Sequence, residues 1–433
     1  MSAEAAPDPA ELIHSAPYRR LLLVCSVVGV LVSLACWAFL EVVHLLQVGL
    51  YTDLPEALGF ETPPWWWPLP ILGVAGVLIA GAVTKLPGRG GHEPSEGLHV
   101  GPPTTARELP GVLLAATATI GLGMVLGPEA PLIAIGSGLA MLVMDQARRP
   151  VPDQTRALVA AAAGFAALAT IFGSPVIGAV IIIEAAGLAG PTLPLILLPG
   201  LMASGIGSLV FVGIGSVTGL SSEAYALPPL TLPAYPTPRV TDFAWVVPLA
   251  LVAALLVFVV MRLAGVVRDL VARQPWVLIP AAALLVGVVA IAFAESSDLS
   301  TETVLFSGED AMAGVLEQGD SLAIGTLLLL LLCKSFTWAV SMGAARGGPT
   351  FPAIFLGLVG GLLCMHLPDF AETPAVGALI AAAVVSVLKL PLSTIILTLL
   401  ITRAGVGVAP LVIVAVVVAY IATLALASRA ARA

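Results

Sequence analysis

Apolar runs separated by short polar or Gly/Pro-rich breaks extend from about residue 20 to residue 428. The first two, 20–48 and 66–84, are long enough for helices that cross a bilayer. The runs at 129–144, 174–187 and 390–402 are shorter and are bounded by proline, glycine or charge. A bilayer tolerates such segments only where protein or water covers their ends. The pattern therefore predicts an all-α integral membrane protein that combines full-length spans with tilted and broken helices.

Composition agrees with this prediction, since 59% of the 433 residues are hydrophobic, 10% are charged and the mean hydropathy is +1.07. No polar block large enough for a soluble domain separates the apolar runs. An enzyme within the membrane would need a metal-binding or nucleophilic constellation. The sequence has no H-E-x-x-H motif and no paired histidines on a predicted helix. We therefore expect no enzymatic activity, no cofactor, no metal site and no nucleic-acid partner.

The distribution of charge predicts an orientation in the plasma (inner) membrane. The breaks at 49–65 and 295–320 are acidic and contain no Lys or Arg, whereas basic residues cluster in other polar breaks and near the C-terminus. By the positive-inside rule, the acidic breaks face outward, and both termini, including the tail 1–19, are cytoplasmic. The Trp65–Trp67 run predicts an interfacial anchor before the second span. Lys334, at the end of an apolar run, is expected to extend its ammonium group to the membrane surface.

The stretch from Gly121 to Gly138 places one carboxylate, that of Glu129, in a long apolar run directly after Gly127-Pro128. Proline is well tolerated in the first turn of a helix, where its missing N–H has no partner to lose. Glu129 would then lie at the positive end of a helix that begins within the membrane. A site that holds a carboxylate can also hold an anion when the carboxylate moves away. The alternative is a glutamate that only complements the start of the helix.

Two motifs recur in the same order and predict an internal repeat. GPEAPLIAIG (127–136) and GPTFPAIFLG (348–357) share the pattern G-P-x-x-P-x4-G. Pro175 matches Pro391, and the spacing between these prolines is nearly the same as the spacing between the two motifs. We predict a first membrane half at 20–215 and a second at 242–433. A Pro-rich linker at 216–241 joins them. Interrupted helices at matching places in two halves point to a binding site near the midplane between them.

Three Gly/Pro-rich motifs resemble those of the CLC family of chloride channels and proton/chloride antiporters, and the likeness covers most of the chain. GPEAP (127–131) is similar to G-[KR]-E-G-P, GGPTFP (347–352) to G-G-x-F-x-P and, more weakly, GGHEP (90–94) to G-S-G-I-P. The run from Lys334 to Thr337 also matches, and 173–187 is similar to a helix of the family's dimer interface. The resemblance implies an inverted-repeat fold and a homodimer in the lipid bilayer, with one anion pathway per subunit. It also implies a short, prokaryotic-type member without CBS domains.

Glu129 aligns with the glutamate of the family motif that acts as the gate, so the resemblance implies that Glu129 is the gate. When deprotonated, its carboxylate would occupy the anion site near the midplane, and when protonated it would give way to the anion. The resemblance places the anion against backbone groups of the three motifs, namely Gly91, His92, Glu93, Pro94, Glu129, Ala130, Pro131, Thr350 and Phe351. Glu184 is the candidate for a proton relay, and a structural acid at a helix end is the alternative.

The chain departs from the family pattern at several of these positions. Gly91 stands where the family has a serine that contacts the anion, and Thr350 stands where it has a phenylalanine. The family's pore tyrosine lies in a final helix, which we expect this chain to lack. Thr350 is the candidate for a replacement hydroxyl donor. Pro128 and Pro349 have no backbone N–H, so we expect fewer and wetter anion contacts and weak selectivity for chloride.

The proton side and the inner vestibule leave alternatives open. Arg346 would either draw anions inward or act as an ordinary inside-positive anchor. His92 and Glu93 would form either a proton-responsive pair or a solvated loop pair. Ala185 stands where the exchangers commonly carry an inner glutamate, which favours uncoupled conduction.

The function we expect is therefore CLC-type transport of chloride or a similar small anion, gated by protonation of Glu129. A proton-coupled chloride or fluoride antiporter is one alternative, and a secondary transporter of another fold is a second.

Overall fold

The computed structural model describes residues 13–97, 102–146, 150–187, 193–218, 227, 229–319 and 321–430. Within these ranges the regular structure is helical, and the only β-type pairing is one isolated bridge. Eight of the described helices are long and apolar enough to cross a membrane. The prediction of an all-α, multi-pass integral membrane protein is confirmed. Residues 1–12 of the expected tail, and 219–226 and 228 of the expected linker, lie outside the described residues.

The described elements follow the pattern of apolar runs closely. In chain order they are α2 (Ala16–Val48), η1 (Gly49–Asp53), α3 (Leu54–Ala57), α4 (Pro68–Lys85), η2 (Pro87–Gly90), η3 (Pro94–Glu96), α5 (Leu109–Gly121), α6 (Glu129–Asp145), α7 (Asp153–Ile171), α8 (Pro175–Ala185), α9 (Leu193–Thr218), α10 (Val240–Val271), α11 (Pro275–Ala294), η5 (Thr301–Thr303), α12 (Glu309–Glu317), α13 (Ile324–Ala344), α14 (Thr350–Cys364), α15 (Glu372–Leu388), α16 (Pro391–Thr402) and α17 (Ala409–Ala430).

The short helices begin where the sequence places proline. Helices α8 and α16 start at Pro175 and Pro391, and α6 starts directly after Pro128. In the first turn of a helix the missing N–H of proline has no intrahelical partner, so the residue fixes the start at little cost. The predicted broken helices are therefore present as separate, short elements.

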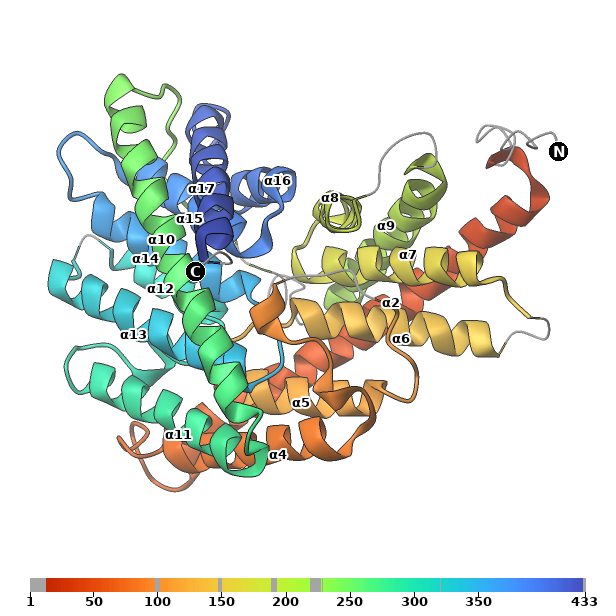
Figure 1. Ribbon diagram of the computed structural model, residues 1–433, viewed down its shortest axis with the longest axis horizontal. Helices are drawn as coiled ribbons and strands as arrows, with labels where there is room; N and C mark the ends of the chain where they lie inside the picture. Colours follow the sequence, from red (N-terminus) through yellow and green to blue (C-terminus); the bar gives the residue numbers. More distant parts are fainter. Residues whose placement is uncertain are drawn as a thin grey trace. The chain divides into compact units, whose positions relative to one another are not determined.

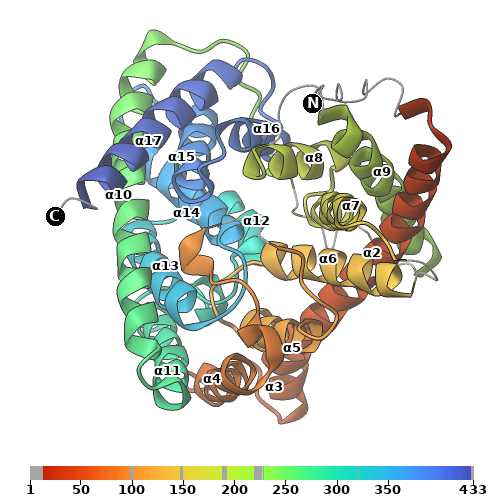
Figure 2. The ribbon, with the colours of Figure 1, turned by 45° about the vertical axis from the view of Figure 1, so that its right-hand side comes forward.

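The chain forms two compact units, and the first contains α2 up to Leu40, α6 from Leu132 onward, and α7, α8 and α9. Figures 1 and 2 show α8 and α9 beside α7. Gly29 of α2 lies against the backbone of Ala203 in α9, so that a side chain at Gly29 would overlap that backbone. Helices in a membrane use small residues in this way to approach closely.

The second unit contains α4, α5 and all elements from α10 to α17. Figures 1 and 2 show α10 (green) as a long helix that runs beside α13, α15 and α17. Alanine and valine side chains of α10, α15 and α17 form an apolar core between these helices, for example Ala254, Ala382 and Ala415. The unit also contains the N-terminus of α6, and it therefore holds both Gly-Pro motifs.

Helix α14 lies directly on α15 because two glycines one turn apart face that helix. A Cβ atom at Gly357 would overlap the Cα atom of Ile380, and one at Gly361 would overlap the Cα atom of Val376. This Gly-x-x-x-Gly spacing is typical of closely packed membrane helices. The contact fixes the position of α14 and, with it, of the residues at its N-terminus.

Two sequence expectations about the acidic breaks are wrong in detail. Residues 49–57 are helical and continue α2, and 301–317 contain η5 and α12, so neither break is a simple loop. Trp67 is buried and its indole N–H donates to the carbonyl of Leu50 at 2.8 Å, whereas Trp65 is well exposed. Of the three tryptophans in the predicted anchor, only Trp65 and Trp66 are exposed.

Candidate functional site

The two G-P-x-x-P motifs meet through their first glycines. The N–H of Gly127 donates to the carbonyl of Gly348 at 2.8 Å, and the N–H of Gly348 donates back to Gly127 at 2.6 Å. These glycines hold the same place in the two motifs. The pairing sets the N-terminus of α6 beside the N-terminus of α14, within the second unit.

The carboxylate of Glu129 is completely buried between these helix starts. Its Oε1 atom accepts a hydrogen bond from the backbone N–H of Thr350, at 2.5 Å, while its Oε2 atom has no described hydrogen-bond partner. Thr350 is the first residue of α14, so its N–H is one of the free donors of that helix. The carboxylate thus occupies a position where a helix N-terminus favours negative charge.

Two glycines form the wall behind the carboxylate. A Cβ atom at Gly348 would overlap Cδ of Glu129, and one at Gly127 would overlap Oε2. Real Cβ atoms do not approach a neighbour so closely, so any side chain at either place would expel the carboxylate. The motif glycines are therefore required by the position of Glu129.

The loop that carries Glu129 is fixed by contacts from three distant segments. These contacts are the hydrogen bonds Tyr51 Oη to the Leu122 carbonyl (3.1 Å), Phe306 N–H to the Gly123 carbonyl (3.3 Å) and Val125 N–H to Ser341 Oγ (3.0 Å). A rigid loop holds the side chain of Glu129 more precisely than a mobile one would, because its own backbone cannot relax. A change in the position of the carboxylate is then a change of side-chain rotamer.

The other predicted anion-binding residues are distributed unevenly around this point. Thr350 and Phe351 are fully buried at the start of α14, and Ala130 and Pro131 lie in the first turn of α6. The hydroxyl of Thr350 is buried beside the carboxylate and makes no hydrogen bond of ordinary geometry. Its position next to the Glu129 carboxylate is the one that a replacement donor would need.

The GGHEP motif is built differently from the other two. Pro94 opens only the three-residue helix η3, so the described residues do not start a long helix there. Gly91 has a φ of 95°, a backbone conformation that suits glycine. A ring nitrogen of His92 lies 2.6 Å from the carbonyl of Gly97. The carboxylate of Glu93 lies 3.4 Å from the guanidinium of Arg346.

Arg346 connects this motif to the second Gly-Pro motif. Its side chain is 9% exposed, and its guanidinium also donates to the carbonyls of Arg89 (3.3 Å) and Ala345 (3.0 Å). Its backbone N–H donates to the hydroxyl of Thr119 at 3.3 Å. Arg346 is thus a buried cation beside the motif glycines rather than a surface anchor.

Lys334 contradicts the expectation that its ammonium group reaches the membrane surface. The side chain is fully buried in α13. Its Nζ atom donates to the carbonyls of Thr303, Leu305 and Phe306 at 3.2, 2.7 and 3.1 Å, and lies 4.7 Å from the ring centre of Phe355. The surface expectation failed because the acceptors come from an earlier segment of the chain, which no sequence pattern linked to Lys334.

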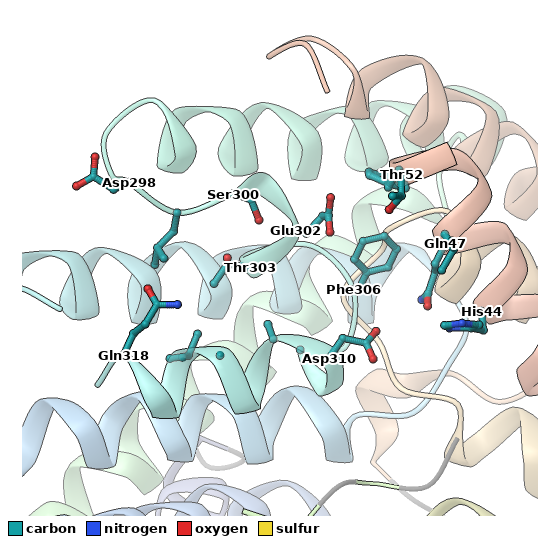
Figure 3. Close-up of a pocket in the computed structure, with 17 residues that line it drawn as sticks. His44, Gln47, Thr52, Asp298, Ser300, Glu302, Thr303, Phe306, Asp310 and Gln318 are labelled. Atoms are coloured by element: carbon teal, nitrogen blue, oxygen red, sulfur yellow. The ribbon is translucent and has the colours of Figure 1, made fainter. Parts of the chain in front are cut away.

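A cavity of about 530 Å³ lies beside the Glu129 loop on the side formed by the two acidic breaks. Figure 3 shows His44 and Gln47 from the end of α2 opposite Glu302, Phe306 and Asp310. The ring of Phe306 meets that of Tyr51 edge-on, with centres 5.0 Å apart, and the backbone of Phe306 bonds the Glu129 loop at Gly123. Sequence reasoning missed this cavity, although the density of acids in 295–320 was a signal.

The pKa values of two acids that line this cavity, Glu302 and Asp310, and of the neighbouring Glu309 are raised. Burial, and then the charge of Asp310, raise the pKa of Glu302. The pKa of Glu309 is raised well above its ordinary value by burial, by Asp310 and then by Glu129. Burial also raises the pKa of Asp310, against a smaller opposing effect of His44. The influence of Glu129 on Glu309 shows that these two carboxylates are electrically close.

Glu184, the candidate proton relay, lies near the end of α8 in the first unit. The helix is apolar apart from this residue, and Ser174 caps its start. Glu184 therefore belongs to a different unit from the carboxylate of Glu129.

A family model described as "Voltage gated chloride channel" matches residues 72–424. A protein of Escherichia fergusonii, named "Putative ion-transport protein YfeO", is 26% identical over 385 residues, which are 86% of this chain and 87% of that protein. The protein of the same name from Salmonella typhimurium is 26% identical over 361 residues, which are 80% and 82% of the two chains.

Two solved structures share the fold over almost the full length. A slow cyanobacterial Cl⁻/H⁺ antiporter matches with a TM-score of 0.77 and 20% identity, covering 94% of this chain and 95% of its own. A CLC-type fluoride/proton antiporter matches with a TM-score of 0.67 and 15% identity, covering 93% and 95%. The family model covers most of the chain, and the fold agrees with it. The chain therefore belongs to the voltage-gated chloride channel (CLC) family, whose members are channels or transporters and not enzymes.

Proposed function

We propose that this protein carries chloride or a similar small monovalent anion across the membrane, and that Glu129 is its gate. The observation that supports the proposal is the place of the Glu129 carboxylate. It is fully buried, it takes the first N–H of α14, and it has one oxygen without a described partner. The same N–H and the same end of the helix would bind an anion.

The gate would work by exclusion. A deprotonated Glu129 holds the N–H of Thr350 and repels any second negative charge from that point. A protonated side chain has no net charge to keep it at the helix start, so it leaves and frees the N–H and the buried hydroxyl of Thr350. Anion binding and protonation then assist each other, as thermodynamic linkage requires. Acid is expected to raise the anion flux.

Two modes of transport follow from this gate. Uncoupled conduction is the mode that Ala185 favours, since no acid follows Glu184. Proton-coupled exchange is the second candidate, and the descriptions of the two structural neighbours as chloride/proton and fluoride/proton antiporters support it. A fixed ratio of protons to anions distinguishes the second mode from the first.

The remaining sequence expectations belong to the same proposal. The protein would act as a homodimer that meets through α8, in the plasma membrane, with both termini in the cytoplasm. The halves 20–215 and 242–433 would form an inverted repeat. The pairing of Gly127 with Gly348, which hold the same place in the two motifs, supports this relation.

The test is anion efflux from liposomes that contain the purified protein, with simultaneous recording of external pH. We expect the wild type to release chloride faster at acid than at neutral pH, and Glu129→Ala to release it at a rate independent of pH. Glu61→Gln, a change at an exposed acid, is the control and should match the wild type. A Glu129→Ala protein with unchanged pH dependence would refute the gate, and a wild type without anion flux would refute the function.

A further inference from the structure

We infer that Arg346 is a second anion contact on the pathway, and that the carboxylate of Glu93 occupies its place when no anion is bound. The inference rests on the proposed function, because it concerns the same anion. It assigns a binding residue to the side of Glu129 where Gly91 provides no hydroxyl.

The position of Arg346 is fixed close to the gate. It precedes Gly347-Gly348, and the backbone of Gly348 forms the wall behind the Glu129 carboxylate. The N–H of Arg346 is tied to Thr119 of α5, and the carbonyl of Gly348 is tied to Gly127. The polar break at 85–107 contains Lys85, Arg89 and Arg107, so the positive-inside rule assigns it to the cytoplasm, and its turn contacts Arg346. An anion from that side would meet Arg346 before it meets Glu129.

The guanidinium has donors to spare. It carries five N–H bonds, and the described residues provide acceptors for three of them. Two of those contacts, to the Arg89 carbonyl at 3.3 Å and to Glu93 at 3.4 Å, are longer than the usual 2.7–3.2 Å. One N–H on Nη1 and one on Nη2 therefore lack a described acceptor. In a side chain that is only 9% exposed, such donors carry a desolvation cost that an anion would remove.

The partner of Arg346 is well placed to leave. Glu93 has 40% of its side chain exposed, so its carboxylate can turn into solvent without becoming a buried, unpaired charge. The guanidinium has less freedom to move, because its side chain is only 9% exposed and Nη1 donates to the carbonyl of Ala345 at 3.0 Å. Glu96 lies close enough to act on the same guanidinium electrostatically. The arrangement repeats that at Glu129, where a carboxylate occupies the place of an anion.

The backbone turn at Gly90 packs closely against the aliphatic part of the Arg346 side chain. A Cβ atom at Gly90 would lie 3.2 Å from Cγ of Arg346 and 2.9 Å from Cβ of Ala115. Gly90 and Gly91 both have positive φ values, of 76° and 95°. The two glycines thus serve the packing of Arg346 as well as the turn.

The chemistry of the spare donors indicates the class of anion. Two N–H bonds on different nitrogens form a fork that fits two oxygens of a planar oxyanion, such as nitrate, as well as a single halide. Lysine keeps the charge but has no fork. The nitrate-to-chloride flux ratio is therefore a readout that a purely structural role of Arg346 would leave unchanged.

The experiment measures the fluxes of chloride and nitrate, and the half-saturating concentration of each, in liposomes with the full-length protein. Arg346→Gln is expected to lower both fluxes on the order of tenfold, the effect of losing one charged hydrogen bond. Arg346→Lys is expected to keep most of the chloride flux and to lower the nitrate-to-chloride ratio severalfold. Glu93→Gln is expected to lower the half-saturating concentration, because the competing charge is gone. Lys85→Gln, which removes an exposed cation at the end of α4, is the control and should match the wild type.

Unchanged flux, half-saturation and ion ratio in Arg346→Gln and Arg346→Lys, with Glu129→Ala still losing its pH dependence, would overturn this inference alone. If Arg346→Gln does not fold, Arg346→Lys and Glu93→Gln decide, and wild-type values in both would overturn it. A wild-type protein that carries no anion would overturn the inference and the proposed function together.

Discussion

The carboxylate of Glu129 depends on two positions that have no side chain. Gly127 and Gly348 form its wall, and they also make the only β-type pairing in the described part of the chain. From the sequence, these residues could be recognised as turn or helix-start glycines. That they face each other across one carboxylate could not be predicted, because they lie in opposite halves of the sequence.

The first prediction concerns Gly348→Ala. The new methyl group would overlap Cδ of Glu129, so the carboxylate must leave the α14 N-terminus. We expect a flux that is high at neutral pH and nearly independent of pH, as in Glu129→Ala. Anion efflux between pH 5 and pH 8 measures it. Gly325→Ala, at a helix position with open space around it, is the matched control, and a folded Gly348→Ala protein with wild-type pH dependence would contradict the account.

The second prediction concerns the buried ammonium group of Lys334. Lys334→Met would leave the carbonyls of Thr303, Leu305 and Phe306 without their donor. A buried acceptor that loses its donor costs about 1–3 kcal/mol, so we expect a loss of stability of about 2 kcal/mol or more. The midpoint of thermal unfolding in detergent measures it. Lys389→Met removes an exposed lysine and should leave the midpoint unchanged, and equal midpoints in the two variants would contradict the role of Lys334.

At the scale of elements, the helix starts were predictable and the contacts between helices were not. Proline marks the start of α8 and of α16, and the Gly-Pro pair precedes α6, because proline is tolerated only in the first turn. The acids of 49–65 predict a loop, yet 49–57 continue α2 as a helix. The cavity at η5 and α12 stayed hidden because it is shared between α2, at the start of the chain, and a segment of the second half.

The third prediction concerns the pH dependence of stability at this cavity. The pKa values of Glu302, Glu309 and Asp310 are raised on folding, mainly by burial. The folded protein therefore binds more protons than the unfolded chain between the ordinary and the raised pKa values, and stability falls as pH rises through that window. Asp310→Asn removes one of the charges that raise the other two pKa values. We expect a higher unfolding midpoint at neutral pH and a smaller loss of stability from pH 4.5 to pH 8.

The control for that measurement is Glu56→Gln, at an exposed acid outside the cavity. It should keep the wild-type pH profile. An Asp310→Asn protein with the same profile as the wild type would show that the cavity acids do not interact as their positions indicate.

At the scale of the whole molecule, the sequence predicted the fold class, the family and the element that carries the candidate gate. Composition and broken apolar runs were enough for an all-α membrane protein, and the GPEAP and GGPTFP motifs were enough for the CLC family. The site was predicted only in part, since the motif residues were identified but their partners were not. Arg346 and Lys334 show the reason: the carbonyls of Arg89 and Leu305 that accept from them lie in distant segments, and burial of a cation cannot be read from its neighbours in sequence.

The central claim is that the Glu129 carboxylate and an anion compete for one site at the N-terminus of α14. Calorimetric titration of the purified protein with chloride, at pH 7.5 and pH 5.5, tests it most directly. The account predicts that Glu129→Ala binds chloride more tightly than the wild type at pH 7.5, and that wild-type affinity rises at pH 5.5 while that of Glu129→Ala does not. Equal affinities for both proteins at both pH values would contradict it.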